Sequence, residues 1–521
     1  MSTRAARPIP YIVVFISSMG VMILELVAGR LVSKYMGNSL FTWTGVIGVV
    51  LGGISLGNFL GGRLADRYPP RRIITLLLLA SSVLTFLVLA LDALLYRVLH
   101  YGTLGPVNGS TVLLSLLLIF ILFFLPSACL GTISPVMAKY ALEVGRRVGK
   151  TVGGIYAVSA IGSIIGTFLC GYLLIPLLGL NTVVVLIGSL LAALALLMGP
   201  LRVAGTAWLF LVGLGLILAA RAGGLQTILH SDSENSRLLY VSDSEYSHIE
   251  VRDLREGVRT ERALLEDALF HNLYDPQRPE ELLYEYEQLF AALSAEAAGV
   301  KDGKDGLSSL TLGAGGCIFP QHLERRFPAG RHVAVEIDSR VLQVARRYFD
   351  LRPDSRLELI VADARNYVQQ AQGRERFDII ILDAFNSFAI PYHLTTVEFV
   401  DLLVRMLEPR GMILANCIDI FTAGRFLNAY RNTLRQALPY VAVYVDRGYN
   451  PQERMTFVLA AAFQPLGLDE LLDEEGLMIG SRLPEAQLEE LHARCGAGHL
   501  SDGYAPVDNL LAPVFLRGGL D

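Results

Sequence analysis

The sequence predicts a multi-span α-helical membrane domain followed by an α/β domain, with helices on both faces of a parallel sheet. Two observations indicate this division. The first 222 residues carry long apolar runs, whereas residues 310–388 alternate short apolar runs with a helix-spaced segment. The composition agrees, because 53% of the residues are hydrophobic and only 18% are charged. Such a skew is typical of a chain that includes a membrane domain.

The membrane half holds seven apolar runs. Most of them contain the roughly twenty apolar residues that a bilayer span needs. The first run is too long for a removable signal peptide, and six more follow it. The predicted spans cover about residues 9–33, 41–62, 73–98, 111–136, 152–178, 182–199 and 204–220.

Two charged residues, Glu25 and Arg30, interrupt the first apolar run. An ionisable group at membrane depth is costly and usually faces protein or water. The two side chains can form a structural pair, with each other or with another helix, or they can mark a substrate site. The sequence leaves both alternatives open.

Net charge and cysteine spacing argue against nucleic-acid binding, a disulfide framework and a zinc site. The net charge of -5 gives no general attraction to nucleic acid, so no nucleic-acid partner is expected. The five cysteines are scattered and show no Cys-x-x-Cys spacing. Neither a disulfide framework nor a zinc site is therefore predicted, and we expect no metal.

Three domains are expected along the chain. The boundaries are 1–222 for the membrane domain, 236–300 for a small β-domain ending in a helix near 280–295, and 301–521 for the α/β domain. In the α/β domain, a helix near residues 396–407 and strands at 411–418 and 440–445 are expected to complete the sheet. The tail from Leu466 is predicted to be helical and acidic.

A ligand site is predicted at the carboxyl ends of the parallel strands. Gly313, Gly315 and Gly316 follow the first strand, where a missing Cβ lets a ligand approach the backbone. Glu336 ends the next strand, about twenty residues further on, where a carboxylate can hold both hydroxyls of a ribose. The pattern indicates a nucleoside site.

Two further acids, Asp363 and Asp383, follow later strands of the same predicted sheet. The carboxyl ends of parallel strands share one edge, so these side chains are expected near Glu336. Asp363 can accept a hydrogen bond from an adenine amino group, and Asp383 is the best candidate for a charged group at a reaction centre.

The segments that carry these acids resemble a known family. VEIDSRVLQVARRYF, ADARNYV and FDIIILDAF are similar to segments of spermidine synthases, aminopropyltransferases that share the Rossmann-like methyltransferase fold. The resemblance spans roughly residues 236–511. IPYHLTTVEF and YAPVDN match the membrane-bound branch, which fuses a multi-span domain to the synthase-like domain.

The resemblance implies roles for the strand-end residues. Glu336, followed by Ile337, would bind the ribose, and Asp363, followed by Ala364, would bind the adenine. Asp383 would face the sulfonium end of the donor, and the glycine loop would hold its methionine-derived tail. The implied donor is decarboxylated S-adenosylmethionine or S-adenosylmethionine itself, and the implied assembly is a homodimer.

The chain departs from the family at three places. Gly316 stands where the family loop has Asp, Ser247 where an early strand has Gln, and Asn386 where the family has its catalytic Asp. An amine acceptor with a pKa of about 10 arrives protonated, and an amide has no basic lone pair to deprotonate it. We expect Asp383, Asn386 and Tyr246 at the reaction centre.

Other side chains are candidates for binding the acceptor or for replacing the lost base. His271 and His393 are further possible bases in sequence order. The expected acceptor-binding residues are Asp243, Glu245, His248, Asp267 and Tyr286, with Tyr284 as the alternative to the last.

Loop charges and donor supply give opposite topologies. The arginines and lysines of short loops gather on the side of the N-terminus, which places that end in the cytoplasm. Seven spans would then leave the C-terminal domain outside. Adenosyl donors are cytoplasmic, so we expect this domain to face the cytoplasm.

The predicted function is transfer of an aminopropyl group from decarboxylated S-adenosylmethionine to an amine. One alternative is an S-adenosylmethionine-dependent methyltransferase acting on a lipid or apolar acceptor. Another is a membrane transporter or sensor that binds adenosyl compounds or polyamines without turnover, which the substitution at Asn386 would favour.

Overall fold

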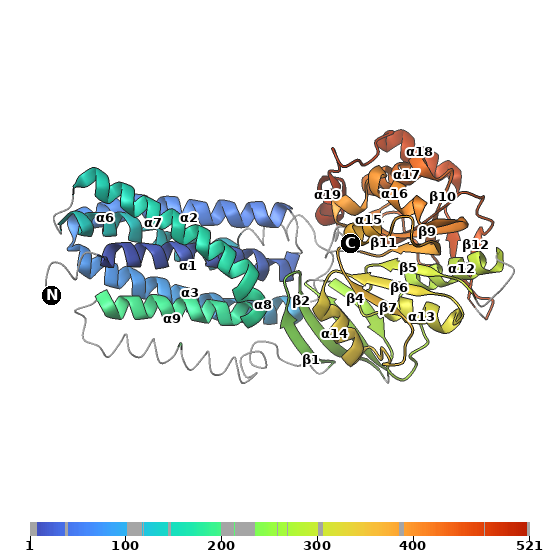
Figure 1. Ribbon diagram of the computed structural model, residues 1–521, viewed down its shortest axis with the longest axis horizontal. Helices are drawn as coiled ribbons and strands as arrows, with labels where there is room; N and C mark the ends of the chain where they lie inside the picture. Colours follow the sequence, from blue (N-terminus) through green and yellow to red (C-terminus); the bar gives the residue numbers. More distant parts are fainter. Residues whose placement is uncertain are drawn as a thin grey trace. The chain divides into compact units, whose positions relative to one another are not determined.

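The computed structural model describes residues 8–36, 40–101, 117, 119–143, 147–198, 213, 235–257, 259–267, 269–300, 306–384, 390–473 and 475–517. The chain divides into two compact units (Figure 1). The first comprises Met1–Leu104, Ser110–Asp232 and Val241–His248. The second comprises Gly105–Gly109, Ser233–Tyr240 and Ile249–Asp521.

Apolar helices build the first unit. In the described part, six stretches are long and apolar enough to cross a membrane, which agrees with the first six predicted spans. The seventh predicted run, 204–220, lies outside the described residues except for Gly213. The helical elements are α1 (Ile9–Met36), α2 (Leu40–Arg67), α3 (Pro70–Tyr101), η1 (Phe120–Phe124), α5 (Leu125–Gly131), α6 (Ile133–Glu143), α7 (Val148–Leu169), η2 (Cys170–Leu174), α8 (Ile175–Leu178) and α9 (Leu180–Met198).

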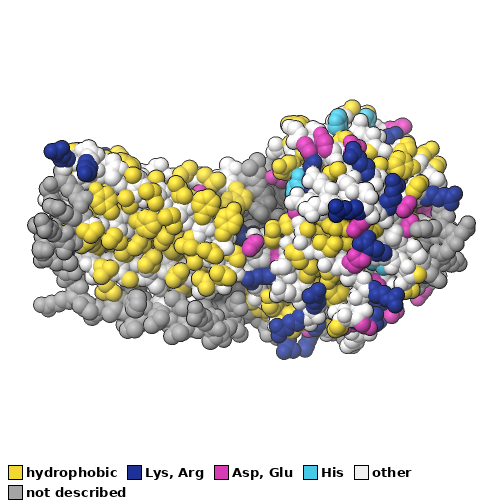
Figure 2. Space-filling view, in the orientation of Figure 1, with side chains coloured by type: hydrophobic (Ala, Val, Ile, Leu, Met, Phe, Trp, Pro, Cys, Tyr) yellow, Lys and Arg dark blue, Asp and Glu magenta, His cyan; other side chains and the backbone are white. Residues whose placement is uncertain are grey.

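Glycines let these helices approach closely. A Cβ on Gly57 of α2 would lie 2.1 Å from the Ala128 carbonyl oxygen of α5. A Cβ on Gly162 of α7 would lie 2.4 Å from the Phe15 carbonyl oxygen of α1. Small residues allow such packing in lipid. The described side chains that Figure 2 shows on the surface of this unit are mostly hydrophobic.

Arg30 has partners within the first unit. Its guanidinium donates to the carbonyl oxygens of Ser244, at 3.1 Å, and Tyr246. The neighbouring Asp243 accepts from the backbone N–H of Leu180 at 2.9 Å. These contacts favour a structural role for Arg30.

A four-stranded sheet begins the C-terminal half, in the order β1-β2-β3-β4. A helix, α12 (Glu285–Val300), follows it, close to the position predicted from the sequence. The strands are β1 (Ser236–Asp243), β2 (His248–Glu256), β3 (Arg259–Glu266) and β4 (Leu269–Tyr274).

The larger sheet has nine strands in the order β12-β13-β10-β11-β9-β8-β5-β6-β7. Its parallel part, as predicted, consists of β5 (Ser309–Leu312), β6 (His332–Glu336), β7 (Glu358–Val361), β8 (Phe377–Leu382) and β9 (Leu407–Ile420). Its antiparallel part consists of β10 (Tyr440–Asp446), β11 (Arg454–Ala462), β12 (Glu470–Leu472) and β13 (Met478–Arg482).

The prediction of parallel strands is confirmed for β5 to β8, and the sheet as a whole is mixed, because β9 and β10 both pair antiparallel with β11. The prediction for the tail was wrong. The tail after Leu466 is not simply helical, because β12 and β13 extend the sheet edge before the last helices begin. In this tail Leu471 is fully buried and Gly480 lies against the Val445 backbone, so pairing and packing against the sheet outweigh the acidic composition.

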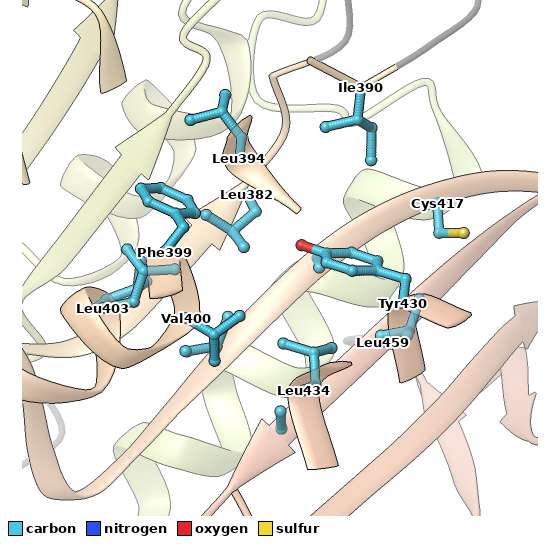
Figure 3. Packing of buried hydrophobic residues seen from close by; sticks show 14 of the residues in the cluster. Leu382, Ile390, Leu394, Phe399, Val400, Leu403, Cys417, Tyr430, Leu434 and Leu459 are labelled. Atoms are coloured by element: carbon cyan, nitrogen blue, oxygen red, sulfur yellow. The ribbon is translucent and has the colours of Figure 1, made fainter. Parts of the chain in front are cut away.

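Helices cover both faces of the large sheet. One face packs Leu382 and Cys417 in one cluster with Phe399 and Tyr430 (Figure 3). The other face packs against α12 and its neighbours. The remaining helices are α13 (Ile318–Arg326), α14 (Ser339–Tyr348), α15 (Ala364–Ala371), η3 (Tyr392–Leu394), α16 (Val397–Arg405), α17 (Arg425–Ala437), α18 (Glu485–Cys495) and α19 (Val507–Arg517).

The strand order creates a switch point between β5 and β8. From β5 the chain builds outward through β6 and β7, then returns to place β8 on the other side of β5. Ligands of open α/β sheets bind at such a point, beyond the carboxyl ends of the strands. Gly313 and Asp383 directly follow these two strands.

Candidate active site

The glycine loop turns sharply after β5. Gly313 and Gly315 have left-handed φ values of 93° and 50°, which glycine adopts without steric cost. A Cβ on Gly313 would lie 2.3 Å from the carbonyl oxygen of Asp383. The loop leads through Cys317, also left-handed at φ 60°, into α13. This backbone geometry explains why glycine stands at positions 313 and 315.

Glu336 orders this loop from the end of β6. Its Oε2 accepts from the backbone N–H groups of Ala314 and Gly315, each at 3.1 Å. Its Oε1 accepts from the N–H of Asp338 at 3.0 Å. Burial, and next the nearby Glu266, raise the pKa of Glu336 to about 7, although the backbone hydrogen bonds oppose the shift. The carboxylate therefore lies at the loop, where a ribose is expected.

Asp383 lies between two hydrogen-bond donors. Tyr286 of α12 donates from its hydroxyl to Oδ2 at 3.1 Å, and Asn416 of β9 donates from Nδ2 to Oδ1 at 2.8 Å. Burial raises the pKa of Asp383, while these two bonds and the nearby His271 lower it. Tyr286, rather than Tyr284, is thus the tyrosine that contacts the predicted reaction centre.

A second chain of polar contacts reaches the glycine loop from the small sheet. Asn272 of β4 accepts from the N–H of Gly316 at 2.5 Å. Its side chain also bonds to Glu287 of α12, which is only 1% exposed. Burial, and then Asp383, raise the pKa of Glu287 well above its ordinary value. Sequence reasoning missed Asn272, Glu287 and Asn416.

Asp363 serves as the N-cap of α15. Its Oδ1 accepts from the N–H of Asn366 at 2.9 Å, and its Oδ2 lies 3.2 Å from Nε2 of His393. The following Ala364 is buried, and Ile337 after Glu336 is 38% exposed. Adenine binding by these residues stays a prediction.

The remaining predicted residues fall in different places. Asp267 is left-handed at φ 52°, in the turn after β3, and lies in electrostatic reach of His271. Asn386 lies outside the described residues.

Four predicted residues belong to the first unit, in its segment Val241–His248: Asp243, Glu245, Tyr246 and His248. There Asp243 binds His248, with Oδ1 2.6 Å from Nδ1. A role for these four residues at the reaction centre stays a prediction.

The site of the second unit is therefore a strand edge lined with carboxylates. Asp383, Glu287 and Glu336 converge on it from β8, α12 and β6. Such a site suits a cationic ligand, because charge-assisted hydrogen bonds to carboxylates are strong. Among the described residues, no group of three or more His, Cys, Asp or Glu side chains is arranged to hold a metal ion.

Comparison with known proteins supports one family. Residues 325–457 match the Spermine/spermidine synthase domain. A polyamine aminopropyltransferase of Vibrio vulnificus is 30% identical over 184 residues, which span 34% of this chain and 58% of that protein. Polyamine aminopropyltransferase 1 of Streptomyces coelicolor is 24% identical over 482 residues, which span 84% of this chain and 80% of that protein.

A methyltransferase also shows similarity. The eEF1A lysine and N-terminal methyltransferase homolog of Drosophila melanogaster is 26% identical over 144 residues, which span 26% of this chain and 21% of that protein. The domain match includes Glu336 at the end of β6, Asp383 directly after β8 and Asn416 within β9. The comparisons therefore support the spermine/spermidine synthase family for the second unit of this chain.

Proposed function

We propose that the second unit transfers an aminopropyl group from decarboxylated S-adenosylmethionine to an amine acceptor. The observation that carries this proposal is Asp383, half-buried at the switch point between Tyr286 and Asn416, beside the loop that Glu336 orders. The names of the Vibrio and Streptomyces relatives give the same activity for those proteins.

In this proposal the chain acts by positioning and electrostatics. Glu336 holds the ribose hydroxyls, the glycine loop faces the donor's tail, and Asp383 faces the sulfonium. The carboxylates near Asp383 bind the cationic acceptor. An in-line displacement at carbon gains most from alignment of its two reactants, and no covalent enzyme intermediate is needed.

Methyl transfer from intact S-adenosylmethionine is the second candidate. The similarity to the fly methyltransferase favours it, and a lipid or apolar acceptor would account for the long apolar helices. A third arrangement, a membrane transporter or sensor, would bind the same ligands without forming product.

Calorimetric titration of the full-length protein in detergent separates these candidates. The ligands are decarboxylated S-adenosylmethionine, S-adenosylmethionine and methylthioadenosine, each followed by product analysis with amine acceptors. We expect the decarboxylated donor to bind most tightly and to yield an aminopropylated amine. Preference for the intact donor, with methylated product, would contradict the proposal, and Glu336→Ala is the control for nucleoside binding.

We further propose a bilayer anchor, a cytoplasmic location of the second unit and a homodimer. The six apolar stretches of span length among the described residues support the anchor, and the supply of adenosyl donors supports the location. Asp354 is 79% exposed and suits an introduced cysteine, Asp354→Cys. A membrane-impermeant maleimide should label it only after the cells are opened. Labelling in intact cells would place the second unit outside.

A further inference from the structure

A β-bulge in β4 sets the position of His271. Leu264 of β3 pairs with Asn272, whereas the next residue, Leu265, pairs with Phe270. His271 is therefore the extra residue, unpaired in the ladder. Bulges of this kind re-aim one side chain and are over-represented next to active sites.

The two ring nitrogens of His271 differ in environment. Nδ1 lies 4.0 Å from Oε1 of Glu266, and the side chain is only 16% exposed. Nε2 is buried and has no hydrogen-bond partner among the described residues. The carboxylate favours a proton on Nδ1, which leaves the lone pair of neutral imidazole on Nε2.

Carboxylates from several elements face this imidazole. Asp383 follows β8, Glu336 ends β6, and Asp267 lies in the turn after β3, where Glu266 precedes it. Burial lowers the pKa of His271, and the three acids Asp383, Asp267 and Glu336 oppose that shift. The ring is thus neutral near pH 7, and the same acids stabilise an imidazolium once a proton arrives.

Two more unpartnered atoms lie in the polar clusters around Asp383. Oε2 of Glu287 and Oδ1 of Asn416 are buried without a hydrogen-bond partner among the described residues. Oδ1 of Asn416 accepts hydrogen bonds, as does Glu287 in its ionised form, and Asp383 bonds directly to Asn416. A protonated primary amine offers three donors and matches such a set of acceptors.

We propose that His271 is the base that deprotonates the acceptor amine in this chain. The inference rests on the aminopropyl transfer proposed above. It supplies the proton acceptor that the amide of Asn386 cannot provide. Tyr286 and Asn416 then hold Asp383 as the anion that faces the charged reactants.

The proposed step balances in atoms and charge. Nε2 of His271 takes one proton from the ammonium of the acceptor. The freed lone pair on nitrogen forms a bond to the propyl carbon of the donor, while the carbon–sulfur bond breaks and its electron pair stays on sulfur. The products are a secondary ammonium and a neutral thioether, and the imidazolium returns its proton to solvent.

The test is the pH dependence of transfer by His271→Gln in the full-length protein, with putrescine as the probe acceptor. We expect kcat/KM for putrescine to fall about 100-fold at pH 7, the usual lower range for loss of a general base. The deficit should shrink as the pH rises toward the amine pKa of about 10, because free amine becomes available. Donor affinity by titration should stay unchanged.

A matched control is His322→Gln, which removes another largely buried imidazole from α13, and it should keep the wild-type profile. His271→Ala supplies a second variant, and added imidazole should restore part of its rate. A loss that is equal at every pH, without rescue, would make His271 merely structural and overturn the inference. Wild-type activity in His271→Gln would also overturn it. A wild-type protein that binds donor but forms no product would instead overturn the proposed function.

Discussion

The α-carbon of Gly313 faces the backbone carbonyl of Asp383 so closely that a Cβ would lie 2.3 Å from the oxygen. The backbone of the glycine loop after β5 therefore packs directly against the backbone at Asp383, after β8.

Replacement of this glycine is the first prediction. Gly313→Ala introduces a backbone clash at φ 93° and should lower the free energy of unfolding by about 2–4 kcal/mol. Gly373 is the control, because it has φ 72° but no atom within 4 Å of a Cβ. Gly373→Ala should cost about 1 kcal/mol from the left-handed backbone alone. Equal thermal shifts in detergent would refute the close approach.

The second prediction concerns Glu336. Its pKa of about 7 exceeds the ordinary 4.5, so the folded protein binds this proton more tightly than the unfolded chain. Below about pH 4.5 the group is protonated in both states, so its burial does not change the pH dependence of stability. As the pH rises from about 4.5 through 7, the free energy of unfolding falls progressively. Glu336→Gln should gain stability relative to wild type between pH 4 and pH 8 by up to about 3 kcal/mol. A difference that is flat with pH would contradict this.

Donor affinity should also depend on the ionisation of Glu336, but it should increase with pH, whereas stability decreases. In the proposed complex the ribose hydroxyls donate to the carboxylate, so the ionised form should bind better. We expect wild-type affinity for the donor to weaken about tenfold for each pH unit below 7. Calorimetry of Glu336→Gln should show weaker binding at pH 8 and no such pH dependence. Unchanged affinity in this variant would remove Glu336 from the nucleoside site.

The third prediction separates two neighbouring tyrosines. Tyr286→Phe removes a hydrogen bond to Asp383, raises the pKa of that acid further and should lower kcat about tenfold to 100-fold. Tyr284→Phe removes only a bond to the Phe270 carbonyl oxygen and should stay within about twofold of wild type. Steady-state values of kcat for the two variants test this prediction. A larger loss in Tyr284→Phe than in Tyr286→Phe would contradict it.

The fourth prediction tests the helix packing of the first unit. Gly57→Ala forces a Cβ to within 2.1 Å of the Ala128 carbonyl oxygen and should destabilise the protein by about 1–3 kcal/mol. Gly62 in the same helix has no atom within 4 Å of a Cβ, so Gly62→Ala is its control. Thermal unfolding in detergent should separate them, and similar melting temperatures would argue against this helix contact.

The sequence anticipated the features that depend on local spacing. Glycines after a strand and acids at strand ends mark the switch point, so Gly313, Glu336 and Asp383 were predictable from chain order. Apolar runs of span length likewise predicted the first six long helices. The antiparallel strands of the tail were not predictable, because short edge strands are fixed by pairing with β10 rather than by their own composition.

The rest of the site depends on long-range register. Asn416 stands opposite the end of β8 because Leu382 pairs with Ala415. His271 reaches the acids through a bulge that leaves no periodic signal in β4. Glu287 had a weak signal, because it shares a helical face with Phe290 and Ser294, both fully buried. Acids in a first helical turn are usually solvated, so the sequence alone favoured the wrong environment.

The position of Glu336, hydrogen-bonded to the glycine loop, has a kinetic consequence for the proposed reaction. Any thioether product of the proposed reaction keeps the ribose of the donor, so the contacts proposed between Glu336 and the ribose would persist after the transfer. Binding energy that is equal before and after the chemical step lowers KM without raising kcat. The product should therefore compete strongly with fresh donor, and its release, rather than bond formation, would set the turnover rate.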